Sequence, residues 1–452
     1  MAKFQYKTIP TPTAKAPTGI WHILANETAE RFAYYGLTLI LVEFMTKHLV
    51  GGVMEGGAAI SWYHLFKAVT YVLPLVGAII ADLWFGKYRT IIMFSIIYCL
   101  GLLIMTVDQS RTGLYLCMIL VAIGSGFIKP CVTANVGDQF GKSNQNMMAK
   151  VYNWFYFAIN FGAFFGPFIT PKLMNNPKYG PKWAFGLAFV WMVLATIIFW
   201  MGRKRYVHAP PAGKSFLKEI FKGEGLGIIK RISVLFLILS VFYALYELSG
   251  SAWIIQVEHL NKHWLGYDWE ASQVPAFNAL FVMILIPIFT YIVYPVLGKF
   301  FNLNALRKIV IGMFFLIIPF LVIVWLEYKI KAGEVPSIGW QFLANFLMTA
   351  AEIFVSIPVL EFAYTQAPKQ MKAFIMSLYL AASIGIGDLW TFIINQLITG
   401  REFFKGANYY WTFIVVMFIA SVVFAVVAAF YKGKIYTQDD VTDKEVAEEV
   451  QP

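Results

Sequence analysis

Long apolar runs recur along this chain from Trp21 to about residue 431, and they constrain its fold more than any other feature. A helix of about 20 apolar residues is long enough to cross a bilayer. Charged residues make up 13% of the 452 residues, whereas soluble domains carry about 25%. The sequence therefore predicts an all-α membrane protein without a separate soluble domain.

We expect twelve membrane-spanning helices. They lie near residues 20–46, 59–84, 90–108, 113–136, 149–173, 183–202, 232–257, 273–298, 307–328, 338–366, 370–399 and 409–431. The connection from about 203 to 231 is the longest polar one, and it separates six spans from six. Two bundles of six helices are typical of transporters that hold their substrate at the midplane between the two halves.

The predicted organisation has five parts. They are an N-terminal segment at 1–19, a six-helix bundle at 20–202, a basic linker at 203–231, a second six-helix bundle at 232–431 and an acidic tail at 432–452. Lys and Arg residues concentrate in the loops on the side of both ends, and such loops face the cytoplasm. We therefore expect a multi-pass protein of the plasma membrane (the inner membrane in a bacterium) with cytoplasmic termini.

Composition also excludes some classes of function. The net charge of +11 does not indicate nucleic-acid binding, because the basic residues lie in short loops between spans. Cys99, Cys117 and Cys131 lie within apolar segments and form no metal-ligand or disulfide pattern. The sequence contains no nucleophile–base set and no nucleotide-binding loop, so we expect neither an enzyme nor a metal site.

The first apolar run carries a polar stripe. At about 100° per residue, Glu27, Glu30, Arg31 and Tyr34 fall on one side of a helix. A charge at membrane depth costs about 2.5 to 3.5 kcal/mol, so these groups need partners or a water-filled cavity. An ion pair between Glu27 and Arg31, four residues apart, is a purely structural explanation. It leaves the second carboxylate and the tyrosine unexplained, which favours a functional site.

Other polar residues interrupt the later spans. Lys129 lies in the middle of span four, and a buried cation needs a carboxylate partner. The best candidate is Glu352, central in span ten, either as a structural pair or as a gate that opens and closes. Asn160 in span five and Asn278 in span eight are either interhelical hydrogen-bonding residues or parts of the same site.

Two further spans carry ionisable groups. His64 and Tyr71 share a face of span two, where the histidine is either an ordinary hydrogen-bonded residue or part of a proton relay. Glu247 follows Tyr243 by four residues in span seven, which places both on one face. Lys67 and Asp388 also lie within spans, but the sequence alone assigns no role to them.

At these residues the chain resembles the proton-dependent oligopeptide transporter (POT) family. The family's first-span motif, Glu-x-x-Glu-Arg-Phe-x-Tyr-Tyr-Gly, is present in full from Glu27 to Gly36. Further similar stretches lie at residues 63–90, 126–132, 137–140, 155–162 and 247–251. The turn that carries Asp82 resembles the loop between spans two and three of major facilitator transporters, where a carboxylate ties helix ends together in one conformation.

The resemblance implies a major facilitator fold and proton-coupled import of di- and tripeptides by alternating access, with the proton as coupling ion and no cofactor. It implies a functional monomer in a lipid bilayer. By position it assigns substrate binding to Arg31, Tyr34, Tyr71, Lys129, Asn160, Asn278, Glu352 and Tyr379. It assigns proton coupling to Glu27, Glu30, Glu247 and His64, and gating to Lys129, Glu352 and Asp82. One departure is Thr38, where many members have an arginine, which leaves the ion partner of Glu247 open.

Two alternatives remain open from the sequence. One is proton-coupled transport of another small solute, such as nitrate or a peptide-like drug. The other is a peptide sensor or channel without proton coupling. The intact first-span motif favours peptides, because plant relatives that carry nitrate often lose it.

Overall fold

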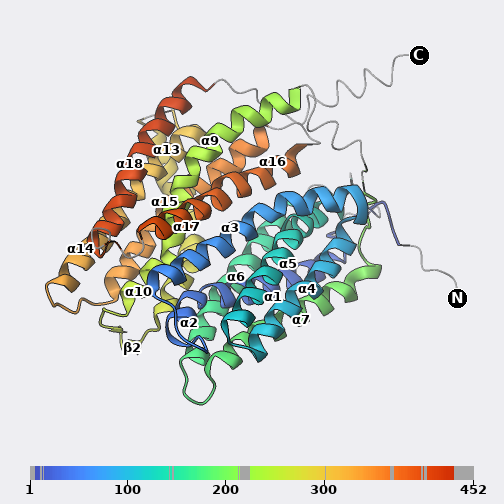
Figure 1. Cartoon of the computed structure of the whole chain (residues 1–452). Helices are drawn as coiled ribbons and strands as arrows, with labels where there is room; N and C mark the ends of the chain where they lie inside the picture. The colour runs from blue at the N-terminus through green and yellow to red at the C-terminus, as the bar shows by residue number, and fades with distance from the viewer. Residues whose placement is uncertain are drawn as a thin grey trace, which may run out of the picture.

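The computed structural model describes residues 6–10, 13, 15–141, 143–144, 147–211, 213, 224–300, 302–366, 371–398, 401 and 405–431. The predicted tail at 432–452, most of the linker and part of the N-terminal segment therefore lie outside the described residues. Across the described part, helices account for nearly all secondary structure, and they form twelve stretches at the places of the predicted spans (Figure 1).

The first half of the chain supplies six of these stretches. They are α1 (Ile20–Thr38) with α2 (Leu41–Lys47), α3 (Gly56–Ile80) with η1 (Ala81–Phe85), α4 (Lys87–Val107), α5 (Arg111–Asp138), α6 (Met148–Met174), and α7 (Gly180–Met201) with η3 (Gly202–Lys204). The predicted first span is divided, because its helix breaks at Leu39 and Ile40. The break separates the polar stripe of α1 from the short helix α2.

The second half supplies the other six. They are α9 (Glu224–Tyr246) with η4 (Glu247–Gly250) and α10 (Ala252–Val257); η5 (Ala271–Ala276) with α11 (Phe277–Ile288), η6 (Phe289–Val293) and α12 (Tyr294–Gly298); α13 (Ala305–Phe315) with α14 (Ile317–Lys331); α15 (Gly339–Thr365); α16 (Lys372–Tyr379) with η8 (Leu380–Gly385) and α17 (Ile386–Ile398); and α18 (Ala407–Phe430). A two-stranded hairpin, β1 (His263–Trp264) and β2 (Tyr267–Asp268), lies between α10 and η5.

Ten of the stretches in the described part are long and apolar enough to cross a membrane by length and hydropathy. The two that fall short of that measure are α1 with α2, and α6. The first contains the charges Glu27, Glu30 and Arg31, and the second contains Asn153 and Asn160. Both of these stretches thus carry polar side chains, and they pack against each other.

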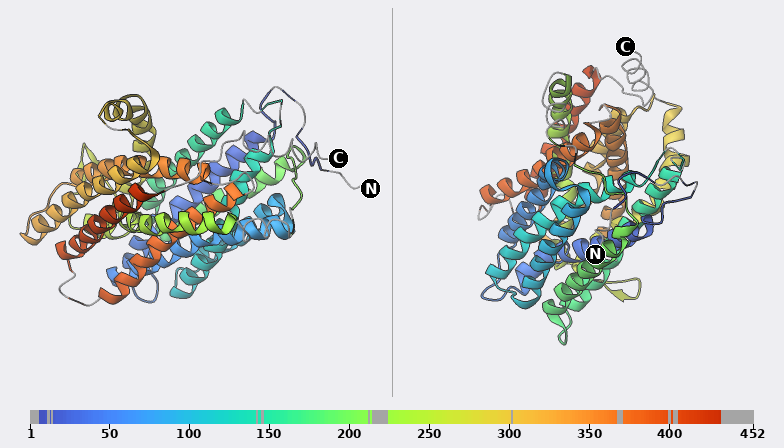
Figure 2. Two further views of the ribbon diagram at one scale, coloured as in Figure 1. Left: turned by 90° about the horizontal axis from the view of Figure 1, so that it is seen from above. Right: turned by 90° about the vertical axis from the view of Figure 1, so that its right-hand side faces the viewer.

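Each half has its own apolar core. One core is built from residues between Ile20 and Tyr206, and the other almost entirely from residues between Ile228 and Phe424. The two halves lie side by side in Figure 1, and both views of Figure 2 show the same division. We call them the N-half (residues 6–211) and the C-half (residues 224–431).

Two glycines, Gly162 and Gly166, let α6 approach α1 closely. A Cβ atom on Gly162 would lie 2.4 Å from the carbonyl oxygen of Thr28, and one on Gly166 would lie 2.4 Å from that of Phe32. Real Cβ atoms do not approach so closely, so only glycine fits at either position. The contact fixes the polar stripe of α1 against α6 at the level of Asn160.

The two ends of the bundles are distinct. At one end Lys7 pairs with Val207 in a β-bridge, and Tyr431 donates a hydrogen bond to Gln366; we call this the terminal end. At the other, where α2 and the β1–β2 hairpin lie (Figure 1), Val50 pairs with Ser110; we call this the hairpin end.

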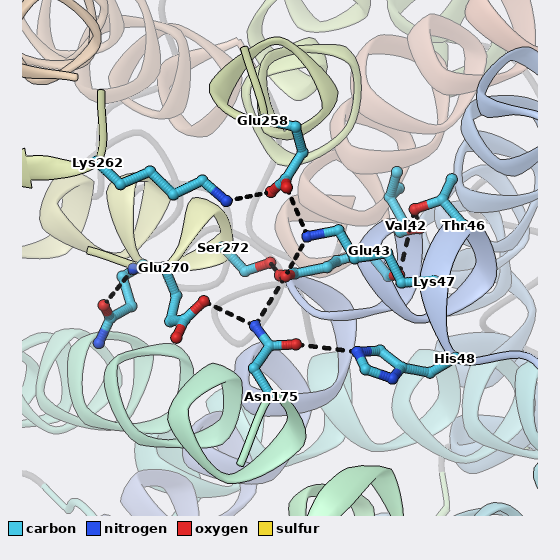
Figure 3. Close-up of polar contacts among 11 residues, drawn as sticks. Val42, Glu43, Thr46, Lys47, His48, Asn175, Glu258, Lys262, Glu270 and Ser272 are labelled. Carbon is cyan, nitrogen blue, oxygen red and sulfur yellow. Dashed lines mark hydrogen bonds and ion pairs between the residues drawn. The ribbon is translucent and has the colours of Figure 1, made fainter. Parts of the chain in front are cut away.

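Polar contacts join the two halves at the hairpin end (Figure 3). The buried carboxylate of Glu43 on α2 accepts hydrogen bonds from Asn175 at 2.9 Å and from Ser272 of the C-half at 2.5 Å. The same Asn175 Nδ2 donates to Glu270 of the C-half at 2.7 Å. Lys47 Nζ lies 2.7 Å from Glu258 Oε2, which is also a contact between halves. The hairpin end is thus closed by side chains from both halves.

Glu258 lies directly after the last residue of α10, beyond the end of its span. Burial alone would raise the pKa of its carboxyl, but hydrogen bonds and charge from Lys262 and Lys47 hold that pKa below its usual range. Because its pKa is lowered, Glu258 is ionised at neutral pH, and its contribution to closure is complete there. That contribution is lost only as the pH falls through the lowered pKa. Mild acid therefore leaves this contact intact.

We expect Gly166→Ala to lower the thermal stability of the purified protein in detergent. Overpacking of this kind costs about 1 to 3 kcal/mol. Gly227→Ala is the matched control, because a Cβ there meets no atom within 4 Å and alanine favours a helix. Equal melting temperatures for the two variants would contradict the close packing of α1 on α6.

We expect Lys47→Gln and Glu258→Gln each to loosen the hairpin end. The double variant should be no looser than the looser of the two single variants. The reason is that both changes remove one contact, so their effects do not add. The measurement is the rate at which an impermeant maleimide, applied from the hairpin side, labels Ala163→Cys on α6, which lines the cavity between the two halves. Lys262→Gln is the control, because Lys262 contacts the same Glu258 at 2.8 Å within the C-half; faster labelling in that control, or fully additive effects, would count against the closure.

Candidate substrate-binding site

A cavity of about 710 Å³ lies between the two halves. Such a volume falls within the range of small-molecule sites, about 300 to 1,000 Å³. The N-half lines it from α1, α3, α5 and α6, and the C-half from α9, η4, η5, α11, α15, α16 and η8. Nine residues to which the resemblance assigns a role lie on its wall: Glu27, Arg31, Tyr71, Lys129, Asn160, Glu247, Asn278, Glu352 and Tyr379.

Arg31 on α1 has two carboxylates at its guanidinium. Its Nε donates a hydrogen bond to Glu27 Oε1 at 2.8 Å, and Glu30 Oε2 lies 2.7 Å from the same nitrogen. All three side chains are buried. Neither oxygen of Glu30 has a hydrogen-bonding partner among the described residues. Two negative charges thus share one positive charge, and a proton on either carboxylate would balance the set.

Lys129 on α5 lies against aromatic rings instead of a carboxylate. Its Nζ is 4.0 Å from the ring centre of Tyr34 and 4.4 Å from that of Tyr71, and no described residue accepts a hydrogen bond from it. The predicted pair with Glu352 is therefore wrong for this conformation. The ring faces hold the ammonium group on the N-half wall by cation–π attraction, and Glu352 belongs to the opposite wall.

Tyr34 also differs from its predicted place. Its side chain has no exposed surface, and it is not on the cavity wall. It lies behind the wall, where its ring contacts Lys129 and lies 5.8 Å from both the Arg31 Cζ and the Lys67 Nζ. Its role in this conformation is to support the cations rather than to line the cavity.

The C-half wall carries the carboxylate of Glu352 on α15. Its Oε2 accepts a hydrogen bond from Asn278 Nδ2 at 2.7 Å, and the same nitrogen donates to Thr349 Oγ1 at 3.0 Å. Tyr379 forms a short hydrogen bond with Tyr243, which in turn contacts Ser356 Oγ at 3.1 Å. The cavity therefore has unpaired or shared cations on one wall and a hydrogen-bonded carboxylate on the other.

Asn160 lies on the N-half wall, where α6 packs on α1. Its Nδ2 donates to the carbonyl oxygen of Tyr156 at 2.9 Å, one turn earlier in the same helix. Tyr156 itself lines the cavity, although the sequence analysis gave it no role. Its spacing of four residues from Asn160 was the signal that could have identified it.

Glu247 in η4 finds its cation on α3. Its Oε2 lies 3.1 Å from Lys67 Nζ, and both side chains are almost fully buried. This contact joins the two halves. Lys67 is thus the cation that pairs with Glu247 in a chain that has Thr38 where many family members have an arginine. No role was assigned to Lys67 from the sequence, although it lies four residues before Tyr71 and so shares its face.

His64 lies one turn before Lys67 and off the cavity wall. Its Nδ1 is 2.7 Å from Asp388 Oδ1 on α17, and its Nε2 is 2.9 Å from Ser251 Oγ. His64, Asp388 and Ser251 have no exposed surface. The histidine is therefore a second contact between the halves, with a carboxylate partner that the sequence could not identify.

Asp82 is not part of this cluster. It belongs to η1, and its backbone carbonyl oxygen accepts a hydrogen bond from Gly213 at 3.0 Å. Among the described residues, the ion pair close to that turn joins Lys87 and Asp138 at 2.7 Å, both in the N-half. In this conformation the predicted gating carboxylate does not bridge the two halves.

Comparison with known proteins places this arrangement in a family. The family model described as the POT family matches residues 88–232 and 223–411. The protein "Peptide transporter family 1" of Drosophila melanogaster is 32% identical over 365 residues, which is 71% of this chain and 49% of that protein. Human "Solute carrier family 15 member 2" is 31% identical over 402 residues, 77% of this chain and 55% of that protein. The chain thus spans about half the length of the curated relatives it matches.

A solved structure gives the same result for the fold. The in meso crystal structure of the POT family transporter PepTSo has a TM-score of 0.86 and 32% sequence identity to this chain. The match covers 92% of this chain and 98% of that one. The major facilitator arrangement expected from the sequence is therefore confirmed, and the chain belongs to the POT family of transporters rather than to an enzyme family.

Proposed function

We propose that this chain is a proton-coupled symporter that imports di- and tripeptides by alternating access. The observation that carries the proposal is the polarity of the central cavity, with Arg31 and Lys129 on the N-half wall and Glu352 with Asn278 on the C-half wall. The similarity to "Peptide transporter family 1" of Drosophila melanogaster supports the proposal.

A zwitterionic peptide fits a cavity of this polarity. Its carboxylate and its ammonium group lie about 5 to 10 Å apart in a di- or tripeptide, at about 3.5 Å per residue. Lys129 has no hydrogen-bonding partner among the described residues and is free to meet the carboxylate. Glu352 offers a carboxylate to the ammonium group. Because all peptides share these two ends, the site would accept many side chains.

The side chains of the peptide need an adaptable surface. Tyr71, Tyr156, Tyr246 and Tyr379 line the cavity and offer both ring faces and hydroxyl groups. Aromatic surfaces of this kind contact apolar and polar groups alike. The volume of about 710 Å³ favours short peptides over long ones.

Proton coupling would act through the first-span carboxylates. Glu27 and Glu30 share the guanidinium of Arg31, so a proton on one of them frees positive charge for the peptide carboxylate. Loss of that proton toward the cytoplasm restores the internal pairing and weakens the hold on the peptide. Glu247 and His64 belong to the contacts between the halves, which links proton binding to their separation.

The orientation follows from the charge of the loops. The terminal end would face the cytoplasm, and the closed hairpin end would face the outside of a plasma membrane, or of the inner membrane of a bacterium. The chain would act as a monomer, with protons as coupling ions and no cofactor.

Two other functions would use fewer of the charged residues on the cavity wall. Nitrate or another small anion would use Arg31 and Lys129 but would leave Glu352 without a positive partner, whereas a peptide-like drug with both charges would use the whole cavity. A peptide sensor or channel without proton coupling would not need paired carboxylates at Arg31.

Uptake into proteoliposomes tests the proposal. With an inward proton gradient we expect accumulation of labelled dialanine and trialanine, because proton entry drives the import. N-acetyl-dialanine, which lacks the ammonium group, should be taken up poorly, and nitrate should not accumulate. Accumulation of dialanine that ignores the gradient would point to a channel, and preferential uptake of nitrate would overturn the peptide assignment.

We expect Glu27→Gln and Glu30→Gln each to abolish gradient-driven uptake while exchange of labelled for unlabelled dialanine continues. The amide keeps the shape of the side chain but cannot take up a proton, so binding and the conformational change persist without coupling. The measurement compares both modes on the same liposomes. Loss of the two modes to the same extent would show that the carboxylates hold the peptide or the fold rather than the proton.

A further inference from the structure

A second pocket lies at the hairpin end and is separated from the central cavity. It has a volume of about 310 Å³ and is lined by Ile60 of α3, Ala252 and Ile255 of α10, and Asn395 of α17, among others. We call it the outer pocket. None of the residues on its wall is on the wall of the central cavity. Side chains therefore fill the space between the two.

The side chains of His64, Asp388 and Ser251 lie in the space between the two pockets, and we call these three residues the separating layer. On α3, His64 lies between Ile60, which lines the outer pocket, and Lys67, which lines the central cavity. Ser251 lies in the same way between Ala252 on the outer side and Gly250 on the cavity side.

Asp388 has the same placement on its own helix. It lies between Asn395, which lines the outer pocket, and Ile384, which lines the central cavity. The three elements thus bring their polar groups to one level, where His64 Nδ1 is 2.7 Å from Asp388 Oδ1 and His64 Nε2 is 2.9 Å from Ser251 Oγ.

The layer is fully buried and incompletely paired. His64, Asp388 and Ser251 have no exposed surface. Asp388 Oδ2 has no hydrogen-bonding partner among the described residues. A buried carboxylate needs an opposite charge or a proton, because an isolated charge is strongly unfavourable away from water.

The neighbouring charges do not supply that opposite charge. The groups that act on Asp388 electrostatically are Lys67 on α3, Glu247 in η4 and Lys129 on α5. Lys67 and Glu247 neutralise each other at 3.1 Å. Lys129 Nζ lies against the rings of Tyr34 and Tyr71 on the wall of the central cavity, and among the described residues it forms no hydrogen bond with Asp388. Tyr63, whose ring contacts His64, is neutral at physiological pH.

We propose that Asp388 forms with His64 an outer proton site, and that this site must carry a proton before the hairpin end can close. This inference rests on the proposed function and adds a residue from α17 to its coupling machinery. With a neutral imidazole and an ionised carboxylate, the pair has a charge of −1. One proton, taken from water at the outer pocket while the halves are apart there, brings that charge to zero.

The proton determines which conformations are accessible. Without it, closing the layer would bury an uncompensated charge, which is strongly unfavourable. With it, the pair is neutral and closes as the structure shows. The proton leaves toward the central cavity, where Lys67 and Glu247 lie, so that each closure of the outer side carries one proton inward.

Asp388→Asn tests the inference in proteoliposomes with a clamped membrane potential. The amide keeps the shape of the side chain, and the layer is then neutral without a proton, so it closes without one. We expect the variant to keep dialanine exchange but to lose gradient-driven accumulation. One coupled proton lets a gradient of one pH unit sustain about a tenfold accumulation ratio, and that ratio should fall to about 1.

His64→Gln gives an independent readout. It leaves Asp388 as the group that needs a proton, so we expect accumulation to persist while the dependence of uptake on outside pH shifts. Thr391→Val is the matched control, because Thr391 is buried on the same helix near Asp388 and bonds the carbonyl oxygens of Gly387 and Ala244. It should behave as the wild type in every assay.

Several results would overturn the inference. Wild-type accumulation and an unchanged pH profile in Asp388→Asn would overturn it, and so would loss of exchange together with accumulation in a protein that is monodisperse. If Asp388→Asn does not fold, an unchanged pH profile in His64→Gln overturns it. Failure of the wild type to accumulate dialanine under a gradient would instead refute the proposed function, so the two failures are distinguishable.

Discussion

A charge within the membrane-spanning part of a protein needs a partner or water, and this requirement organises the whole structure. Each such charge costs about 2.5 to 3.5 kcal/mol on insertion scales. Arg31 meets the requirement with carboxylates on its own helix, Lys67 with Glu247 of the other half, and Lys129 with the faces of two tyrosines. These solutions converge on one cavity, which leaves the rest of the spans free to be apolar.

Contacts between the halves differ with depth, and the difference bears on how the halves separate. At the hairpin end Lys47 and Glu258 are about one-third exposed, and exposed ion pairs contribute only about 0 to 1 kcal/mol. Deeper in the protein, Lys67 with Glu247 and His64 with Asp388 are almost completely buried. Removing one partner of a buried pair costs about 3 to 5 kcal/mol. The buried ion pairs therefore resist separation of the halves more strongly than the exposed pair of Lys47 and Glu258.

The sequence could predict which face of a helix is polar, but not which helix that face meets. The period of the helix places Glu27, Glu30 and Arg31 together, and the structure agrees. It gives no information on pairs such as His64 and Asp388, which are 324 residues apart in the chain. The expected pairing of Lys129 with Glu352 failed for the same reason. Charge balance required a partner for the lysine, and a ring face, which carries no charge, met the requirement instead.

Two glycines show the complementary case, in which the sequence was informative. The interval of four residues between Gly162 and Gly166 on α6 predicts a close approach of another helix, and α1 occupies that groove. The approach is possible because neither glycine has a Cβ, which would lie 2.4 Å from the carbonyl oxygen of Thr28 or of Phe32. A motif of small residues thus specifies that a helix packs closely, while the identity of the partner depends on the remaining chain.

The charge balance of the site explains why a proton, and not the peptide, would supply the driving force. A zwitterionic peptide brings one positive and one negative charge, so its binding leaves the net charge of the cavity unchanged. A proton at Glu27, Glu30 or the His64–Asp388 pair changes that net charge by one. The free energy of burying the site on closure depends on its net charge, because a group of side chains with zero net charge is far less costly to bury than one with an uncompensated charge. Under the proposed function, the proton would thus decide whether the halves can close, and the peptide would decide only whether the two walls of the cavity are bridged when they do.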